Sequence, residues 1–419
     1  MTRRPRFRVF AAPAAALLAA AGCGRAAPDA ARAATAQPAA AWSAPVAAPA
    51  LTDALGRGAR HEAAALAATG DGVVHAVFAA DQDGDGWGDA LRYARLQDGR
   101  WSAPERVKEG AGLAEDARLA VDGDGVVHVL WLANLGGAAA QWPTAVMERR
   151  RTATGWAPAR VLFREPGTHG MPARSLAAAT GPGGVVEVLF PADGRGVGRV
   201  RLRGAAASSV AYIPRDGRSL ALSAGAPGAP LVATFIAEAV SPRHPRAESD
   251  VFAATLRGGG WGGAAQVHAA DRRYSHYPQA VAGAHGARHL VWLEDTDGSV
   301  FPEAVFYARS LDGEQWTAAR DVTPAALRGG VPLRAAAVLD DRGTVHVVLR
   351  ATRAGGGRPG LYHFALRGGV PGPLTTLAAP GELGPGSTQA VYDPLRRTVV
   401  ALWRGVDGVY RTARLATTG

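Results

Sequence analysis

The chain has 419 residues, of which 47% are hydrophobic and 20% are charged, and its formal net charge is +10. A basic chain can be a nucleic-acid-binding protein, but Lys108 is the only lysine and the arginines are spread over the whole length. Because no basic stripe with interleaved aromatics appears, we expect no nucleic-acid partner.

The N-terminal segment is typical of an exported bacterial protein. Several arginines precede a short apolar run over residues 9–21, which predicts a signal peptide over residues 1–22. The run is shorter than the roughly 20 residues of a transmembrane helix. It ends at Leu18-Ala19-Ala20-Ala21-Gly22-Cys23, which resembles a bacterial lipoprotein box with Ala20 in place of the consensus Leu. We expect lipid on Cys23, a tether over residues 23–40, and a periplasmic or cell-surface location in the cell envelope. The alternative is an ordinary signal peptide cleaved near Ala21.

A short apolar phrase recurs about every 54 residues from residue 73 onward. Its clearest copies are Val73–Phe78 and Val126–Trp131, and a His or its replacement marks an anchor position in each copy. The seven anchors are His75, His128, Glu187, Val232, His289, His346 and Val400. A period of this length in a β-rich chain indicates a repeat fold.

Each repeat contains four expected strands joined by tight turns. In the first repeat, residues 63–68 precede a Gly-Asp-Gly turn, the anchor strand follows, and residues 90–95 and 101–107 complete the unit. Short Val-, Leu- and Tyr-rich runs bounded by Gly and Asp are typical of antiparallel hairpins. Radially arranged four-stranded units form propellers of roughly 4–8 blades. We therefore predict an all-β, seven-bladed β-propeller over residues 41–419.

The two ends of the chain predict how the ring closes. After the anchor Val400 only one further strand fits, at residues 408–414, so the last repeat lacks its outer strand. The outer strand of the first repeat begins Trp101-Ser102-Ala103-Pro104, and the same letters occur at Trp42-Ser43-Ala44-Pro45. We expect the Trp42 segment to be the outer strand of the seventh blade.

Two repeated residue types have structural rather than catalytic interpretations. The anchor histidines lie one to a blade, so they form no metal cluster, and we expect buried hydrogen-bonding residues. The outer-strand tryptophans are expected to pack between blades; they are Trp101, Trp156, Trp261 and Trp316.

One acidic loop predicts a metal site. Four carboxylates alternate in a Gly-rich loop at Asp81, Asp83, Asp85 and Asp89. This spacing suits Ca²⁺, which takes 6–8 oxygen ligands, and it resembles the calcium loops of integrin-type propellers and thrombospondin repeats. The pattern is interpreted as occurring once, so the Ca²⁺ would be structural and local. The alternative is a solvated acidic turn.

A second group of polar residues lies 12 to 14 positions before the anchors, where the innermost strands begin. Because these strands start at one mouth of the channel, we expect a ligand site there. The candidate ligand-binding residues are His61, Arg174, Arg218, His276, Tyr277 and Arg334. The alternative is a polar rim that only solvates the channel.

The unit pattern resembles the bacterial neuraminidase-repeat (Asp-box) sialidase superfamily over residues 60–417. The closest Asp-box remnant is Ser310–Trp316, which lacks one residue of the family form. The resemblance implies an arginine cluster for a substrate carboxylate, for which Arg174, Arg218 and Arg334 are the candidates. The family's Arg-Ile-Pro motif survives only as Tyr212-Ile213-Pro214-Arg215, with its Arg displaced, and the Tyr, Glu and Asp of catalysis have no matching positions.

Two functions follow, and the sequence does not decide whether the protein is an enzyme. The motifs favour a noncatalytic, lipid-anchored module that binds a glycan or an envelope protein at the channel mouth, with the membrane contacted only through the lipid. The alternative is a sialidase-like glycoside hydrolase or a polysaccharide lyase, with Glu62, Glu115, Asp116 and Glu294 as the carboxylates to test. A purely structural scaffold is a third possibility.

Overall fold

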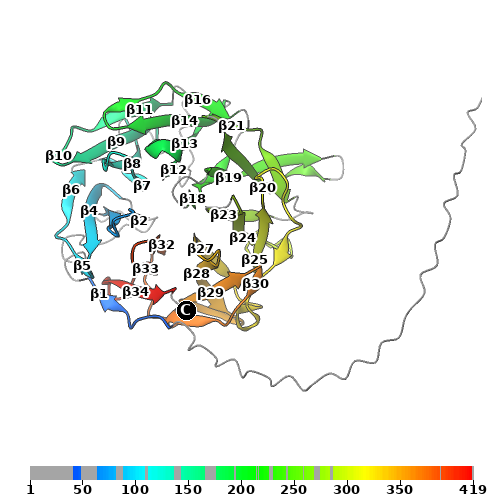
Figure 1. The fold of residues 1–419 in the computed structure, drawn as a ribbon. Coiled ribbons are helices and arrows are strands. Elements are labelled where there is room, and N and C mark those ends of the chain that lie inside the picture. Colours follow the sequence, from blue (N-terminus) through cyan, green and yellow to red (C-terminus); the bar gives the residue numbers. More distant parts are fainter. Residues whose placement is uncertain are drawn as a thin grey trace, which may run out of the picture. The chain divides into compact units, whose positions relative to one another are not determined.

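The structure is a computed structural model that describes most of the chain from residue 41 to residue 417. The described residues are 41–48, 64–81, 88–108, 112–135, 143–165, 176–192, 195–213, 215, 217–225, 230–241, 244–257, 259–268, 274–283, 286–386 and 388–417. They form seven antiparallel sheets, the blades, arranged as a ring around a central channel (Figure 1). The predicted seven-bladed propeller is confirmed.

Each blade contains four strand positions, numbered from the channel outward. The innermost strands are β2 (Ala64–Ala68), β7 (Glu115–Val121), β12 (Ala177–Thr180), β17 (Arg218–Leu222), β23 (Ser275–Ala282), β27 (Pro332–Leu339) and β32 (Gln389–Asp393). The second strands are β3 (Val74–Ala80), β8 (Val127–Ala133), β13 (Val186–Ala192), β19 (Val232–Ser241), β24 (Arg288–Glu294), β28 (Val345–Arg353) and β33 (Thr398–Arg404). All seven predicted anchors lie on these second strands.

The third and outer strands complete the blades. The third strands are β4 (Ala90–Gln97), β9 (Ala145–Thr152), β14 (Gly196–Arg203), β20 (His244–Arg257), β25 (Ala304–Ser310), β29 (Gly356–Arg367) and β34 (Tyr410–Ala416). The outer position holds β5 (Arg100–Trp101) with β6 (Glu105–Lys108), β10 (Gly155–Trp156) with β11 (Arg160–Arg164), β15 (Ala206–Ala207) with β16 (Ala211–Ile213), β21 (Gly260–Trp261) with β22 (Ala265–His268), β26 (Arg320–Asp321), β30 (Val370–Pro371) with β31 (Thr375–Ala378), and β1 (Val46–Ala47). A short strand, β18 (Ala224–Gly225), adds parallel to β23.

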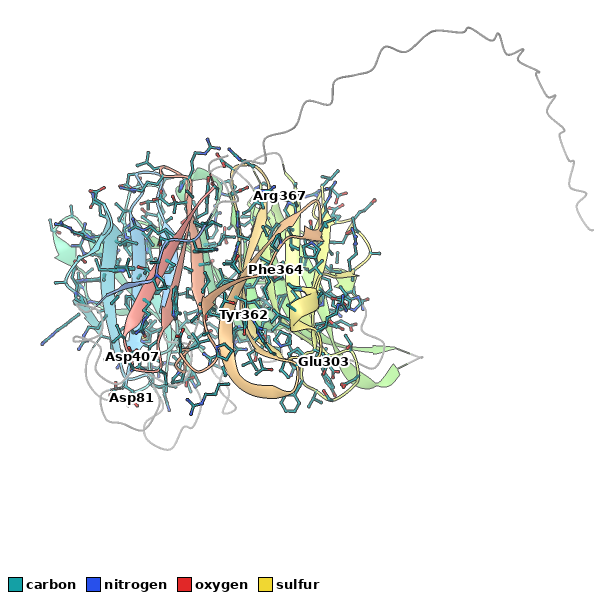
Figure 2. The ribbon with its side chains drawn as sticks, turned by 90° about the horizontal axis from the view of Figure 1, so that it is seen from below. Asp81, Glu303, Tyr362, Phe364, Arg367 and Asp407 are labelled. Carbon is teal, nitrogen blue, oxygen red and sulfur yellow. The ribbon has the colours of Figure 1, made fainter. Side chains whose placement is uncertain are left out.

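The two faces of the ring carry different connections. The mouth face carries the starts of the innermost strands and the loops between second and third strands. The turn face carries the tight turns that follow the innermost and third strands. Figure 2 shows Asp81, Glu303 and Asp407 toward the mouth face and Arg367 toward the opposite one.

Acidic side chains organise the turns after the innermost strands. Asp122 Oδ1 accepts the backbone N–H of Asp124 and of Val126, both at 2.9 Å. Gly125, which follows in the turn, has φ +76°, a left-handed conformation that glycine adopts without strain. The Gly-Asp turn therefore forms a hairpin because the aspartate accepts backbone N–H groups of the turn and the glycine takes the left-handed conformation.

The core is divided into seven main clusters of buried side chains, each shared by two neighbouring blades of the described chain. The second strands are buried on both faces; for example, every residue of β3 and β8 is buried. Because each blade packs its apolar faces on both neighbours, the ring has no exposed apolar sheet face in these clusters.

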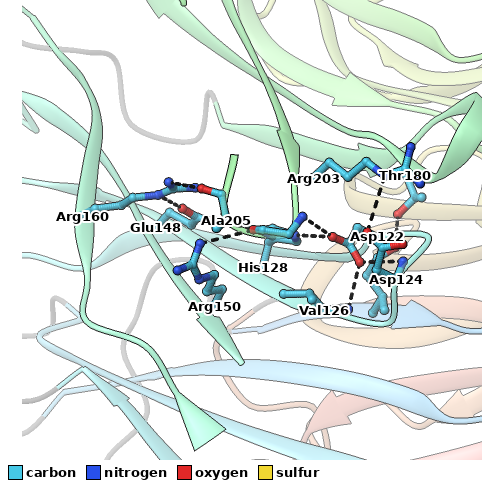
Figure 3. A network of polar contacts seen from close by, with 12 residues as sticks. Asp122, Asp124, Val126, His128, Glu148, Arg150, Arg160, Thr180, Arg203 and Ala205 are labelled. Carbon is cyan, nitrogen blue, oxygen red and sulfur yellow. Dashed lines mark hydrogen bonds and ion pairs between the residues drawn. The ribbon is translucent and has the colours of Figure 1, made fainter. Parts of the chain in front are cut away.

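The anchor histidines are buried and hydrogen-bonded, as predicted. His75 Nδ1 lies 2.7 Å from the Tyr93 hydroxyl, and His128 Nδ1 lies 2.6 Å from Glu148 Oε1. Figure 3 shows His128 in a polar network with Asp122 and Glu148. Asp122 Oδ2 also accepts the backbone N–H of Gly204 in the next blade, at 2.6 Å. The anchors therefore join strands and blades.

The predicted ring closure is also confirmed. β1 pairs with β34, and Trp42 forms a bridge with Leu415. Ser43 Oγ accepts the backbone N–H of Arg414 at 3.0 Å, as Ser102 Oγ accepts that of Arg95 at 3.0 Å in the first blade. The N-terminal segment thus repeats the outer-strand contacts of the first blade. Figure 1 shows β1 beside β34.

The outer-strand tryptophans pack between blades. Trp156 of the second blade lies edge-on to Tyr93 of the first, with ring centroids 5.4 Å apart, and its indole N–H donates to Glu105 at 2.8 Å. The helices of the described chain are the short 3₁₀ segments η1 (Pro182–Gly184) and η2 (Ala325–Leu327), and neither has the length to cross a bilayer.

Candidate functional site

The central channel of the ring forms a cavity with a volume of about 1560 Å³. Its wall is made by the innermost strands and is rich in alanine, as at Ala335, Ala336 and Ala337 of β27. Small side chains leave the channel wide. Polar side chains gather where these strands begin, at the mouth face.

A β-bulge recurs where the innermost strands begin. The strand register shifts at this point in β7, β17, β23 and β27. In three of these strands the bulge contains a residue with a left-handed backbone: Asp116 at φ +51°, Ser219 at φ +52° and Tyr277 at φ +51°. Bulges re-aim side chains and are common next to functional sites. A left-handed aromatic residue is strained by about 1–3 kcal/mol, and such strain clusters at functional sites.

Blades 4 to 6 bring a group of basic and aromatic side chains to this mouth, termed the mouth cluster: Arg218, His276, Tyr277, Arg334 and Arg350. The Arg334 guanidinium carbon lies 3.5 Å from the centroid of the Tyr277 ring. Arg350 is directly opposite Arg334 in the β27–β28 pairing. The Arg218 guanidinium donates to Ser249 Oγ at 2.6 Å.

Arginine charges act on neighbouring side chains within the mouth cluster. Burial lowers the pKa of Arg350, and the nearby charge of Arg334 lowers it further. Burial also lowers the pKa of His276, and Arg218 and Arg334 add to that shift while Glu294 and Asp295 oppose it. His276 Nε2 and Thr388 Oγ1 are buried and have no hydrogen-bond partner among the described residues. Buried polar atoms without a hydrogen-bond partner are rare in folded proteins, and a bound ligand or a water molecule usually satisfies them.

The three candidate catalytic carboxylates in the described chain, Glu115, Asp116 and Glu294, are buried. Asp116 is 2% exposed, accepts the backbone N–H of Leu176 at 2.5 Å and pairs with Arg118 at 2.6 Å. Glu294 is fully buried and accepts hydrogen bonds from Ser275 and Trp292, both at 2.7 Å. Glu115 is also buried. These carboxylates stabilise the strand starts, and no exposed acidic pair for glycoside hydrolysis is seen among them.

Four of the six sequence-predicted ligand residues fall in the described chain, and all four belong to the mouth cluster: Arg218, His276, Tyr277 and Arg334. His61 and Arg174 lie outside the described residues, as do Glu62, Cys23, Asp83 and Asp85. The displaced motif lies elsewhere: Tyr212 is on the outer strand β16, and the Arg215 guanidinium stacks on Phe252, 3.7 Å from the ring centroid.

Arg350 was missed because it is on a second strand, outside the window before the anchors. The sequence nevertheless contains a signal that could have identified Arg350. It lies four residues after the anchor His346, where a charged side chain interrupts an apolar strand.

The predicted calcium loop is described only at its ends. Asp81 is buried at the end of β3, and the Asp89 N–H donates to the Ala80 carbonyl at 3.0 Å. The Lys108 ammonium donates to the Asp89 backbone carbonyl at 2.5 Å and to that of Gly112 at 2.8 Å. These contacts fix the loop ends, and the Ca²⁺ assignment stays a prediction.

A related acidic group, which does not keep the full pattern, lies in blade 5. In blade 5, ligand oxygens of Asp295, Asp297 and Glu303 lie within 4.8 Å of one another. Counted from the anchor His289, these residues and Ser299 occupy the positions that Asp81, Asp83, Asp89 and Asp85 occupy relative to His75. Comparing offsets from the anchors would have found this related group.

The same blade 5 loop exposes an aromatic ring. Asp295 donates its backbone N–H to the Tyr274 carbonyl at 2.9 Å, which ties the loop to the start of β23. Asp295 Oδ2 accepts the N–H of Val300 at 2.8 Å, and Val300 has φ +69°, a strained value for a β-branched residue. Phe301 follows and is 63% exposed. Polar contacts therefore hold a strained loop that presents an apolar ring on the mouth face.

No family model matches this sequence, and no curated protein matches it. Solved structures of propeller proteins are similar to this chain in fold. An ulvan lyase of polysaccharide lyase family PL25, bound to -[GlcA(1-4)Rha3S]-, is similar with a TM-score of 0.58 at 12% identity, over 85% of this chain and 93% of that one. A protein of unknown function from Dyadobacter fermentans has a TM-score of 0.51 at 12% identity, over 73% of this chain and 95% of that one. The NanB sialidase of Streptococcus pneumoniae has a TM-score of 0.46 at 12% identity, over 85% and 68%. At these identities the likeness shows the fold alone.

Proposed function

We propose that this protein binds an acidic polysaccharide at the channel mouth over blades 4 to 6. The observation that carries the proposal is that the charges of Arg218 and Arg334 both act on His276. Arg350 lies beside Arg334, and its guanidinium donates to the carbonyls of Gly384 at 2.8 Å and Gly386 at 3.2 Å. Arg334 and Arg350 are close enough for the charge of one to lower the pKa of the other. An anionic ligand would relieve this repulsion, and guanidinium groups bind carboxylate and sulfate-like oxygens through paired N–H donors.

Two further features favour a sugar as the carrier of the negative charge. The exposed Phe301 offers a ring face on which the apolar side of a pyranose can stack. His276 Nε2 and Thr388 Oγ1 have unmet hydrogen-bonding capacity that hydroxyl groups can satisfy. The oligosaccharide bound to the similar ulvan lyase contains glucuronate, an acidic sugar of this class.

Binding should be measured by titration calorimetry with polygalacturonate, dextran sulfate and neutral dextran. We expect binding of an anionic polymer and none of dextran. Arg218→Ala and Arg334→Ala should each weaken binding about tenfold or more, since a hydrogen bond to a charged group contributes about 1.5–3 kcal/mol. Arg100→Ala, at an exposed arginine of the turn face, is the matched control. Equal binding of dextran, or equal losses in the control, would contradict the proposal.

A polysaccharide lyase acting at the same cluster is the second candidate. Its supporting observation is His276, whose lowered pKa keeps the ring neutral and able to accept a proton near pH 7. In a β-elimination, His276 would take the proton on the carbon next to the uronate carboxylate. The released electron pair would form a C=C bond as the glycosidic C–O bond breaks, and the Tyr277 hydroxyl would give the leaving oxygen its proton. Arg218 and Arg334 would stabilise the enolate charge.

The two candidates separate in one assay. A lyase produces an unsaturated uronate, which absorbs in the ultraviolet, from polygalacturonate or another uronate polymer. We expect His276→Gln to abolish that signal while polymer binding persists. Binding without any unsaturated product in the natural chain supports the noncatalytic module instead.

A further inference from the structure

The closing strand fixes the face at which the chain enters the propeller. β1 is antiparallel to β34, with Ala47 opposite Arg411 and Trp42 opposite Leu415. The Arg411 end of β34 adjoins the loop from β33 on the mouth face, whereas the Leu415 end lies beside Thr398, at the turn after β32. Residue 41 therefore enters at the turn face, opposite the mouth cluster.

Apolar side chains protrude from the turn face of blades 5 to 7, near this entry point. Leu311, in the turn after β25, is 69% exposed. Val370, after β29, is 59% exposed, and Leu395, after β32, is 60% exposed. Each lies at or beside a tight turn. Leu and Val at such positions can enter the interfacial region of a bilayer without moving the backbone.

Arginines flank these apolar tips. Arg309 and Arg367 end the third strands of blades 5 and 6, and Arg342 lies in the turn after β27. All three side chains are exposed, and none forms an ion pair with another described residue. The neighbouring acids are engaged: Asp341 pairs with Arg397 at 2.8 Å, and Asp312 accepts N–H groups within its own turn. The surface thus offers free positive charge between apolar tips.

We propose that this surface docks the propeller on an anionic lipid bilayer, with Leu311, Val370 and Leu395 among the headgroups and Arg309, Arg342 and Arg367 on lipid phosphates. Basic residues beside apolar tips match the combined apolar and electrostatic attraction of peripheral membrane proteins. The chain position favours a membrane over a protein partner. The predicted lipid attachment at Cys23 is 18 residues before Ala41, a reach of at most about 60 Å, so a lipid there would keep the propeller at a high local concentration beside the bilayer.

Docking in this orientation has a consequence for the proposed function. The mouth cluster lies on the opposite face of the ring, so it points away from the bilayer. The propeller would then present its binding site to polymers outside the membrane to which it is attached.

The test uses the full chain with Cys23→Ser, which removes the lipid site and leaves a background without cysteine. Single cysteines replace Leu311, Val370 or Leu395, and Val406 on the mouth face, which is 62% exposed, is the matched control. Each variant carries an environment-sensitive dye and is mixed with vesicles of phosphatidylglycerol and phosphatidylcholine. We expect a blue shift at the three turn-face positions and none at Val406. Equal shifts at Val406, or no shift at any position, would overturn the proposal.

A charge comparison gives a second, independent readout. Arg309→Ala with Arg367→Ala should lower binding to the phosphatidylglycerol vesicles about tenfold. Arg353→Ala with Arg358→Ala removes the same charge from the hairpin between β28 and β29 on the mouth face and should leave binding unchanged. Equal losses in the two double variants would show that net charge, and not this surface, drives binding. Thermal unfolding checks that each variant folds.

Discussion

The Arg334 guanidinium stacks on the Tyr277 ring with its central carbon 3.5 Å from the ring centroid, and this contact joins blade 6 to blade 5. Both residues belong to bulges at the start of innermost strands. A cation–π contact of this kind contributes about 0.5–2 kcal/mol. It holds a charged group at the mouth against the repulsion of Arg350 and helps to offset the left-handed backbone of Tyr277.

Arg334→Lys tests whether stacking, and not charge alone, matters. The lysine keeps the positive charge but has no planar fork to stack on Tyr277 or to bind a carboxylate through two N–H groups. We expect about tenfold weaker binding of polygalacturonate by calorimetry and a small loss of thermal stability. Arg100→Lys is the control, and an unchanged affinity in Arg334→Lys would show that a point charge suffices.

The pH dependence of ligand binding tests His276. Glu294, Asp295, Arg218 and Arg334 all act on this ring, and burial holds its pKa below the ordinary 6.5, so the ring is neutral at pH 7. As the pH falls through the lowered pKa, the ring gains a positive charge in a site that binds anions. Dextran sulfate, which stays ionised, should therefore bind more tightly as the pH falls from 7 through the lowered pKa of His276. The increase should vanish in His276→Gln, and a persistent increase would assign it to another group.

Buried histidines, two of them anchors and one on the third strand β29, make the propeller sensitive to acid. Burial lowers the pKa of His75 and His289 to about 4 and that of His363 to about 3. These rings stay neutral in the folded state while the unfolded chain takes up protons below pH 6.5. Stability is therefore complete above the unfolded pKa and is lost as the pH falls from about 6.5 to 4, by on the order of 3 kcal/mol per histidine.

The measurement is the thermal midpoint as a function of pH. His75→Gln with His289→Gln should flatten its decline between pH 6.5 and 4. Tyr307→Phe is the control, because it removes the hydroxyl 2.7 Å from His289 Nδ1 without removing the titrating ring. An equally steep decline in the double variant would exclude these histidines as the cause.

Ring closure predicts a large difference between two truncations. Deleting residues 24–50 removes β1 and the Trp42 ring, which packs at 5.0 Å from His363 of blade 6, and it leaves the edge of β34 unpaired. Deleting residues 24–38 removes none of these contacts. We expect a much lower thermal midpoint for the first deletion and no change for the second. Trp42→Ala alone should cost about 3 kcal/mol, and equal midpoints for both deletions would contradict the closure.

Calcium binding at the blade 1 loop remains a prediction that terbium luminescence can check. Trp87 lies inside the Asp81–Asp89 loop and would sensitise a bound Tb³⁺. We expect terbium emission that Ca²⁺ displaces, and a rise in thermal midpoint with Ca²⁺. Asp83→Asn with Asp85→Asn should abolish both effects. Asp297→Asn, in the related blade 5 loop, distinguishes the two loops, and emission lost only there would move the site to blade 5.

The fold could be predicted because each repeat contains short sequence motifs that specify its strands and turns locally. The anchor phrase, the Gly-Asp turn and the Trp-Ser outer strand recur, and each acts over a few residues, so seven copies predict seven blades. The closing strand was equally predictable. Ser43 makes the backbone contact of Ser102 because the same letters meet the same third-strand geometry.

Which arginines bind neighbouring blades, and which remain at the surface, depends on contacts between blades. Arg199 donates to the Gly259 carbonyl of the next blade at 2.9 Å, and Arg257 donates to the Asp312 carbonyl of the next at 2.6 Å. Part of the arginine excess therefore fastens neighbouring blades. The repeat period shows that arginine recurs, but not which carbonyl it reaches.

By itself the sequence determined the blade count, the closure and four members of the mouth cluster, since strand starts in a propeller converge on one face whatever their side chains. Only the tertiary structure added Arg350, placed Phe301 on the mouth face, buried Asp116 and Glu294, and set Arg334 over Tyr277. The physical reason is that side-chain direction at these positions depends on bulges and on packing between blades. Both arise from contacts between residues far apart in the chain, which a local pattern does not encode.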